Sequence, residues 1–290
     1  MSLQALVILL VVTTGIAAAA SAVHVLARRH RQIWQELFRL REQLRALRAD
    51  LISVQKEAVR AGVHETTRLP VLLPSQDGEE IVLWNFFDRK KDGFFIDVGA
   101  YDGITFSNTY FFEALGWTGI LIEPMPDFFD ACRTRRPYSR VIHAALSDGA
   151  GKTETTLHVA TGAKAAGLET LSFIGDNPLQ LARIERAAGR VHSVTVPCRS
   201  LNEILADHKG SIDFVSIDVE GAELDVLRGF DVVRYRPRVL VVEDNSYGVD
   251  KRVGLWLGER GYEERLRCEH NVFYTRADDS RAFTFAAPDR

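Results

Sequence analysis

Two short apolar runs in the middle of the chain each end in residues that could hold a nucleoside cofactor. The first, Phe94–Val98, contains Asp97 and leads directly into the glycine-flanked turn 99–103. A buried strand that turns sharply into a helix in this way presents backbone N–H groups and a helix N-terminus to a ligand. The second run, residues 119–122, ends in Glu123, from which a carboxylate can accept hydrogen bonds from both hydroxyls of a ribose.

The spacing of the glycines separates this turn from a dinucleotide site. Gly99 and Gly103 enclose three residues, one of which is Asp102, and this departs from the G-x-G-x-x-G pattern. A carboxylate in the turn would repel a pyrophosphate, whereas it would attract the cationic, amino-acid end of S-adenosylmethionine. The pattern therefore favours a methyltransferase over a nicotinamide-dependent enzyme.

Acidic residues also follow two later apolar runs. Asp218 and Glu220 come at the end of the run that starts at residue 213, and Glu243 ends the run 238–243. The carboxyl ends of parallel strands share one edge of a sheet, so these side chains should converge on the transferred methyl group. Crowded like charges raise at least one pKa, which makes a carboxylate a useful base. We therefore predict Asp218, Glu220 and Glu243 as the catalytic residues.

A metal site is the alternative for the same edge. Asp218 together with Asp244 and Asn245 offers hard oxygen ligands of the kind that suit Mg²⁺. An acid after one strand and Asp-Asn after the next resemble the magnesium site of catechol-type O-methyltransferases. Our expectation is a site that works without a metal.

The fold expected for residues 75–276 is a largely parallel sheet with helices on both faces, because apolar strands alternate there with helical stretches. A helix is expected at 76–87, and another from 108 to Gly116. The strands are expected at 94–98, 119–122, 141–146, 213–218 and 238–243, followed by a hairpin at 261–266 and 271–275. Residues 160–192 do not fit the alternation and are expected to form an inserted lid or surface loop.

The net charge and the cysteine content of the chain limit the kinds of partner and compartment to be expected. The chain has 290 residues and a net charge of −3, which gives no general attraction to nucleic acid. Its three cysteines are odd in number and lack metal-ligand spacing, so reduced thiols in the cytosol are expected.

The N-terminal segment predicts a membrane anchor. Residues 3–27 contain no Asp, Glu, Lys or Arg and are long enough to cross a hydrocarbon core. A cleaved signal peptide is the alternative, supported by small residues at 18–22, but the first four residues lack a basic side chain. Arg28, Arg29 and Arg31 follow the span, so the positive-inside rule places the rest of the chain in the cytoplasm. We expect a single-pass membrane protein with a span in residues 1–27.

Residues 28–62 predict a coiled-coil helix. Apolar residues alternate at spacings of four and three at Ile33, Leu37, Leu40, Leu44, Leu47, Leu51, Val54 and Ala58. With the leucines at 37, 44 and 51 as position a, a homo-oligomer through residues 33–58 is expected. The alternative is one amphipathic helix that packs on the catalytic domain or on the membrane. Residues 63–74 are expected as a linker and 277–290 as a tail.

Five ordered motifs between residues 75 and 275 resemble those of the FkbM-type methyltransferases. They are QDGE at 76–79, FIDVGAYDG at 95–103, SNT at 107–109, W-x-GILIEP at 117–124 and IDVEGAE at 217–223. The resemblance implies a Rossmann-like class I methyltransferase sheet of seven strands with the last antiparallel. It also implies methylation by S-adenosylmethionine, typically of a hydroxyl on a polyketide or sugar. Many members have lysine where this chain has Ser216, so any role of that lysine does not carry over.

These observations together define the expected site and function. The predicted cofactor-binding residues are Asp97, Gly99, Ala100, Tyr101, Asp102, Gly103, Asn108, Glu123, Pro124, Ser147 and Asp148. The turn 97–103 is assigned to the methionine end, Glu123 to the ribose and the turn 145–148 to adenine. We predict an O-methyltransferase for a glycan, lipid-linked or polyketide-like acceptor at the cytoplasmic membrane face. The alternatives are a Mg²⁺-dependent catechol-type enzyme and a non-catalytic membrane scaffold, against which the intact acidic motifs weigh.

Overall fold

The computed structural model describes residues 42–63, 67–161, 173–174 and 190–285, together with 29, 33, 35, 36 and 38–40. It divides into two compact units, Met1–Val54 and Gln55–Arg290, which are considered separately. Residues 42–62 are helical, as the heptad pattern predicts. The predicted membrane span 3–27 lies outside the described residues. Within the part that is described, no helix has the length and apolarity that a membrane crossing needs.

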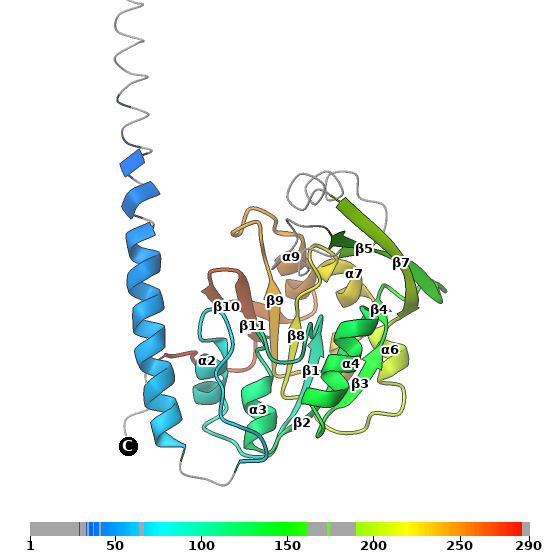
Figure 1. Cartoon of the computed structure of the whole chain (residues 1–290), viewed down its shortest axis with the longest axis horizontal. Coiled ribbons are helices and arrows are strands. Elements are labelled where there is room, and N and C mark those ends of the chain that lie inside the picture. Colours follow the sequence, from blue (N-terminus) through cyan, green and yellow to red (C-terminus); the bar gives the residue numbers. More distant parts are fainter. Residues whose placement is uncertain are drawn as a thin grey trace, which may run out of the picture. The chain divides into compact units, whose positions relative to one another are not determined.

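A seven-stranded sheet forms the centre of the second unit (Figure 1). Its order is β10-β11-β9-β8-β1-β2-β3, and the last five strands are parallel. β11 runs antiparallel to both of its neighbours, β9 and β10. The strands are β1 (Phe94–Val98), β2 (Thr118–Glu123), β3 (Arg140–His143), β8 (Phe214–Ile217), β9 (Val239–Glu243), β10 (Tyr262–Cys268) and β11 (Asn271–Arg276). This is the Rossmann-like methyltransferase sheet that the sequence predicts.

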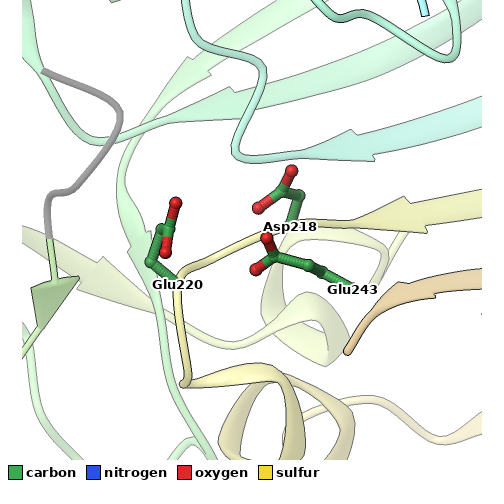
Figure 2. A group of neighbouring side chains, drawn as sticks. All are labelled: Asp218, Glu220 and Glu243. Carbon is green, nitrogen blue, oxygen red and sulfur yellow. The ribbon is translucent and has the colours of Figure 1, made fainter. Parts of the chain in front are cut away.

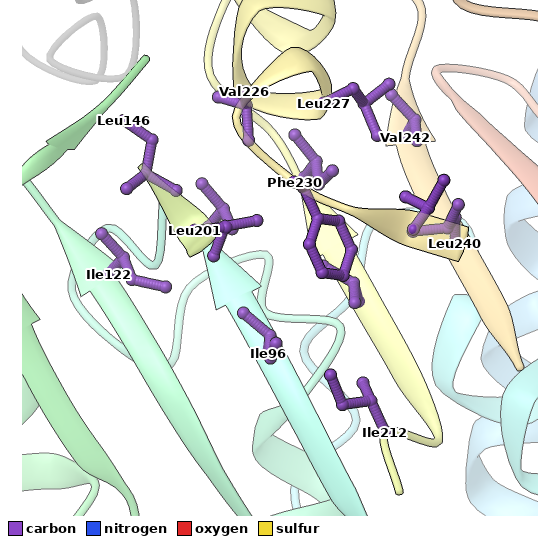
Figure 3. Packing of buried hydrophobic residues seen from close by; sticks show 14 of the residues in the cluster. Ile96, Ile122, Leu146, Leu201, Ile212, Val226, Leu227, Phe230, Leu240 and Val242 are labelled. Carbon is purple, nitrogen blue, oxygen red and sulfur yellow. The ribbon is translucent and has the colours of Figure 1, made fainter. Parts of the chain in front are cut away.

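The parallel strands are apolar on both faces because helices cover both faces. Alternate residues of each strand point to opposite sides, so Ile96 and Val98 enter one core while Phe95 enters the other. The first core also holds Ile122 and Val242 (Figure 3). Its helical side chains come from α6 (Leu201–Ile204), α7 (Glu223–Arg228), α8 (Val232–Tyr235) and α9 (Arg252–Gly258).

The second core lies against α2 (Glu79–Phe86) and α3 (Tyr110–Leu115). Phe86 of α2 stacks on Phe283 with their ring centroids 4.5 Å apart, and Phe285 also packs against this core. Residues 277–285, expected as a tail, therefore add to the packing of the domain. α3 ends at Gly116, whose φ of 117° no β-carbon-bearing residue adopts easily.

The end of the helix 42–62 docks on this side of the domain. Val59 and Val63 pack against the second core. Lys56 donates to the carbonyl oxygens of Leu73 (2.9 Å) and Ser75 (2.5 Å), and it lies 3.5 Å from the buried Glu80 carboxylate. The last turns of the helix are thus part of the catalytic unit.

A second sheet, of four strands, differs from the sequence-based expectation in two places. The run 141–146 was expected as one strand, but β3 ends at His143, and β4 (Ala145–Leu146) pairs with β7 in the other sheet. Ile142 of β3 and both residues of β4 are apolar and buried, so the run shows no break in the sequence. β5 (Glu154–Thr161) and β7 (Arg190–Arg199) form a long antiparallel pair, with β6 (Phe173–Ile174) beside β5. The expected insertion thus begins and ends in strands, and its residues 162–172 and 175–189 lie outside the described part.

We predict that the protein loses stability as the pH rises from 5 to 8.5. Burial raises the pKa of Glu80 to about 7 from 4.5, although Lys56 opposes the shift. The folded state therefore binds this proton more tightly, and its stabilisation is lost as the pH rises through 7; the difference corresponds to about 3 kcal/mol. The measurement is the thermal unfolding midpoint of the full-length protein at pH 5, 6, 7 and 8.5.

Glu80→Gln should make this pH profile less steep, because the amide does not titrate while other buried carboxyl groups, such as Glu123, still do. Glu57→Gln, at an exposed position on the neighbouring helix, is the control and should leave the profile unchanged. A Glu80→Gln profile as steep as that of the unmodified protein would contradict the assignment to this carboxyl group.

Candidate active site

The turn after β1 and the turn after β8 meet at the carboxyl edge of the sheet. Gly99 has a φ of 83°, and a β-carbon at this position would lie 1.8 Å from the backbone oxygen of Asp218. Only glycine satisfies both conditions. The Asp218 N–H donates to the Val98 oxygen at 3.0 Å, and the Gly99 N–H donates to the Ile122 oxygen at 3.0 Å. The ends of β1, β2 and β8 are thus joined at one point.

A cavity of about 280 Å³ opens at this point. It is lined by Gln76, Asp97, Gly99, Ala100, Tyr101, Thr105, Phe106, Ser107, Asn108, Glu123, Pro124, Met125, Phe128, Leu157, Ser216, Asp218, Val219, Glu220, Glu243, Asn245 and His270. Among these described lining residues there are five carboxylates and no lysine or arginine. A cavity with this lining attracts a cation and repels an anion.

Glu123 lies at the end of β2 and is almost completely buried. Its two carboxylate oxygens accept hydrogen bonds from the Tyr101 N–H (2.9 Å) and the Met125 N–H (2.8 Å). Burial raises the pKa of Glu123 to about 8, and the two backbone hydrogen bonds offset this only in part. When ionised, each oxygen keeps a further lone pair, so the carboxylate can accept two hydroxyl donors from a cationic ligand, whose charge and donors favour the ionised form.

Asp97 is held beneath the same cavity by hydroxyl groups. The Thr109 hydroxyl donates to its carboxylate, and the Ser107 hydroxyl lies 3.5 Å from the same oxygen. Burial raises the pKa of Asp97, while the positive charge of Arg136 and these hydroxyls act in the opposite direction. Asn108, which lies between the two hydroxyl residues, donates to the Ser216 hydroxyl at 3.1 Å. The loop after β1 is therefore tied to β8 by side chains as well as by the backbone.

Three carboxylates converge on the opposite wall (Figure 2). Asp218 and Glu220 come from the turn after β8, and Glu243 comes from the end of β9. One oxygen of each lies within 4.8 Å of an oxygen of the other two. Asp218 and Glu243 are close enough to share a hydrogen bond, and Asn245 donates to Glu243 at 2.7 Å.

The shared hydrogen bond requires a proton. Burial, together with the negative charges of Asp218 and Glu220, raises the pKa of Glu243 far above its usual range. Glu243 therefore keeps a proton at neutral pH and donates it to Asp218. Burial raises the pKa of Asp218 as well, but the hydrogen bond from Glu243 acts in the opposite direction, so Asp218 is the member of the pair that ionises first.

Comparison with known proteins identifies the domain. The family model described as the methyltransferase FkbM domain matches residues 97–264. The chain belongs to this family. The match begins at Asp97 and includes the carboxyl end of β1 and all of β2, β8 and β9, whose carboxyl ends form the cavity. Among curated proteins, no significant match is found.

Solved structures similar to the chain are methyltransferases. The METTL16 methyltransferase domain is 12% identical, with 71% of this chain and 68% of that chain covered and a TM-score of 0.39. A putative RNA methyltransferase from Pyrococcus horikoshii is 13% identical, with 78% and 98% covered and a TM-score of 0.37. A Podospora anserina methyltransferase bound to S-adenosylhomocysteine is 11% identical, with 79% and 88% covered and a TM-score of 0.36. These similarities do not bear on the acceptor of the FkbM domain.

Not every predicted cofactor residue of the FkbM domain lines the cavity. The Asp102 carboxylate accepts hydrogen bonds from the N–H groups of Ile104 and Thr105 and from Arg135. Partial burial acts to raise the pKa of Asp102, but these hydrogen bonds outweigh it and lower the pKa. Gly103 packs against Arg136 and Cys132. Asp102 and Gly103 therefore stabilise the conformation of the turn. This geometry does not favour the predicted contact of Asp102 with the cationic end of the cofactor.

Ser147 and Asp148, predicted to contact adenine, also lie outside the cavity lining. The Ser147 N–H donates to the Arg199 oxygen at 2.9 Å, and Asp148 accepts from the Ala150 N–H at 3.1 Å. Both residues follow β4. Because β3 already ends at His143 and β4 belongs to the second sheet, these residues lie away from the cavity. Met125, Phe128 and Leu157 provide the apolar lining beside Glu123 in their place.

The alternative metal ligands are not brought together. Asp244 is turned into its own loop, where it accepts from the N–H groups of Ser246 and Gly248 and from Arg267. Partial burial acts to raise the pKa of Asp244, but the Ser246 and Arg267 hydrogen bonds outweigh it and lower the pKa. The carboxylates that do converge are those of Asp218, Glu220 and Glu243.

Sequence reasoning missed Arg136, which supports the loop after β1. It follows α4 (Pro126–Arg135) and is fully buried, with its guanidinium between the rings of Phe95 and Tyr110. It donates to the Gly103 oxygen (3.1 Å) and to the Glu113 carboxylate (2.8 Å). Further contacts reach the Thr109 hydroxyl (3.0 Å), the Ser107 hydroxyl (3.4 Å) and the Asp97 carboxylate (3.9 Å). An arginine in a run of basic residues carries no sequence signal for this role.

We predict that Arg136→Met lowers the free energy of unfolding by about 3–5 kcal/mol, because it leaves the Glu113 carboxylate buried without its partner. The measurement is urea unfolding of the full-length protein. Arg133→Met, on the exposed side of the same helix, is the matched control and should change stability little. The double variant Arg136→Met with Glu113→Gln should recover part of the loss; a double variant no more stable than the single one would show that the ion pair is not the cause.

Proposed function

We propose that the chain is an S-adenosylmethionine-dependent O-methyltransferase that acts on a hydroxyl of a glycan, lipid-linked or polyketide-like acceptor at the cytoplasmic face of a membrane. The family supports the methyl transfer. The finer proposal depends on the pair Asp218 and Glu243, because Asp218, which ionises first, would be a proton acceptor beside the predicted cofactor-binding turn. The membrane location is inferred from the apolar segment 3–27 and the arginines after it.

The residues of the cavity fit S-adenosylmethionine. Glu123 has two acceptor positions left for a ribose diol, and Met125, Phe128 and Leu157 provide an apolar wall for a flat ring. The acidic lining suits the cationic charge of the molecule. When bound, S-adenosylmethionine would supply an electrophilic methyl group on a sulfonium.

The chain's own residues would remove the proton that a hydroxyl acceptor must lose. An alcohol is a weak nucleophile, and a positioned base contributes about 10²–10⁴-fold to the rate. Asp218, the member of the pair that ionises first, would accept the hydroxyl proton. Glu243 and Asn245 would hold it in place, since Asn245 fixes Glu243 and Glu243 shares its proton with Asp218. Alignment of the two reacting atoms would supply the rest of the acceleration.

The non-catalytic scaffold is the competing proposal. A scaffold has no use for three carboxylates crowded within 4.8 Å, because their mutual repulsion costs stability. Calorimetry of the full-length chain with S-adenosylhomocysteine and with NAD⁺ separates the possibilities. Our proposal requires binding of the first and not of the second; binding of neither supports the scaffold, and binding of NAD⁺ alone supports a nicotinamide enzyme.

We predict that Glu123→Ala weakens S-adenosylhomocysteine binding by about 1.5–3 kcal/mol, because two ribose hydroxyls lose a charged acceptor. The measurement is the dissociation constant from calorimetry, with far-ultraviolet circular dichroism to show that the variant is folded. Glu259→Ala, an exposed glutamate after α9, is the control and should bind as the unmodified chain does. Unchanged affinity in a folded Glu123→Ala variant would remove Glu123 from the site.

Asp218→Asn should keep S-adenosylhomocysteine affinity within a few-fold while turnover on a hydroxyl acceptor falls by at least about 10²-fold. The amide preserves the shape but cannot accept the proton. EDTA separates a base from a metal ligand, because a metal enzyme would lose activity and recover it with Mg²⁺, whereas a carboxylate base would be indifferent. Near-normal turnover in the Asn variant would exclude both roles for Asp218.

A further inference from the structure

The long helix at the N-terminal side of the catalytic unit has two faces with different environments. One face carries the heptad positions a and d, called here the seam. All of its described members are exposed: Ile33, Leu40, Leu44, Leu47, Leu51, Val54 and Ala58. Among them, Leu44, Leu47 and Val54 expose about two thirds of their surface, at 67%, 65% and 67%. A row of large apolar side chains exposed over this length marks an interaction surface.

The other face is already occupied by the catalytic domain. Lys56 and Val63 fall at heptad position f, and Val59 falls at position b. Lys56 bonds to the backbone at Leu73 and Ser75, and the two valines pack against the second core. Position f lies opposite the a/d seam on a helix of this period. The contacts of residues 56–63 with the second core therefore use positions b and f and not the seam positions a and d.

We propose that the seam binds the seam of a second copy of this chain, in a parallel coiled coil. The apolar residues recur every 3.5 residues over more than three heptads, and this period is the one that keeps two helices in contact along their length. Binding to an irregular protein surface would not require this regular spacing. A lipid surface would be served by a broader apolar stripe of period 3.6.

Charges beside the seam fit a parallel partner. The g positions are Glu36, Gln43, Asp50 and Glu57, and the e positions include Arg41 and Arg48. In a parallel pair each g residue meets the e residue five positions later on the partner, which sets Glu36 against the partner's Arg41 and Gln43 against the partner's Arg48.

Disulfide trapping in the full-length chain tests the geometry. The native cysteines Cys132, Cys198 and Cys268 are buried, so an introduced surface cysteine reacts against a low background. Leu51→Cys places a cysteine at position a, where the two copies of a parallel pair come within bonding reach. Ala49→Cys, two residues earlier and exposed at position f, is the matched control. We expect an oxidised dimer from Leu51→Cys and at least ten-fold less from Ala49→Cys; equal trapping of both would overturn the proposal.

Sedimentation of the full-length chain in detergent tests the association itself. The triple variant with Leu40, Leu44 and Leu47 each changed to Gln should dissociate at a concentration at least 100-fold higher than the unmodified chain. Phe38→Gln is the matched control, since Phe38 is also large, apolar and exposed (66%) but lies at position b. Its oligomer should persist. Calorimetry with S-adenosylhomocysteine should give the same affinity for all three proteins, which separates this proposal from that of the enzymatic function.

Three outcomes would overturn the proposal. The unmodified chain could sediment as a monomer at high concentration, which would leave the seam to another protein or to lipid. Phe38→Gln could dissociate as readily as the triple variant, which would make the association non-specific. The triple variant could remain as oligomeric as the unmodified chain, which would place the contact elsewhere.

Discussion

The close approach of Gly99 to the Asp218 backbone oxygen is the constraint on which the site depends. It forces the turns after β1 and β8 to touch, so that the predicted cofactor-binding turn and the predicted catalytic carboxylates share one cavity. No side chain fits at residue 99, because a β-carbon would lie 1.8 Å from that oxygen and the backbone there has a positive φ. The position of Asp218 is consequently set by the backbone of the sheet, whereas its charge is set by its neighbours.

Around this contact the protein accepts a cost in electrostatic energy. Asp97, Glu123 and Glu243 all have raised pKa values, chiefly because burial removes them from water. Backbone N–H groups, hydroxyls and the buried guanidinium of Arg136 compensate part of this. A cationic ligand that brings hydroxyl donors would compensate more, and the cavity is thus more favourable with such a ligand than without it.

Much of this was predictable from residue order. Strand β1 lies at 94–98 as expected, and Glu123, Asp218, Glu220 and Glu243 line one cavity because strand ends of a parallel sheet share an edge. The expectation failed at 141–146, since a mostly apolar run looks the same whether or not the chain changes sheet at Ala144. Arg136 and Phe128 could not be found, because their roles arise from how α4 packs under the loop. Asp102 was assigned to cofactor binding because of its negative charge, but its carboxylate instead accepts hydrogen bonds from backbone N–H groups of the turn and from Arg135.

Amide hydrogen exchange of the full-length chain, with and without S-adenosylhomocysteine, tests most directly whether this cavity is the cofactor site. The account predicts that the ligand slows exchange in the loop 99–109 and in residues 123–128, while α9 and the hairpin of β10 and β11 exchange as before. Protection confined to other segments, or none at saturating ligand, would contradict it.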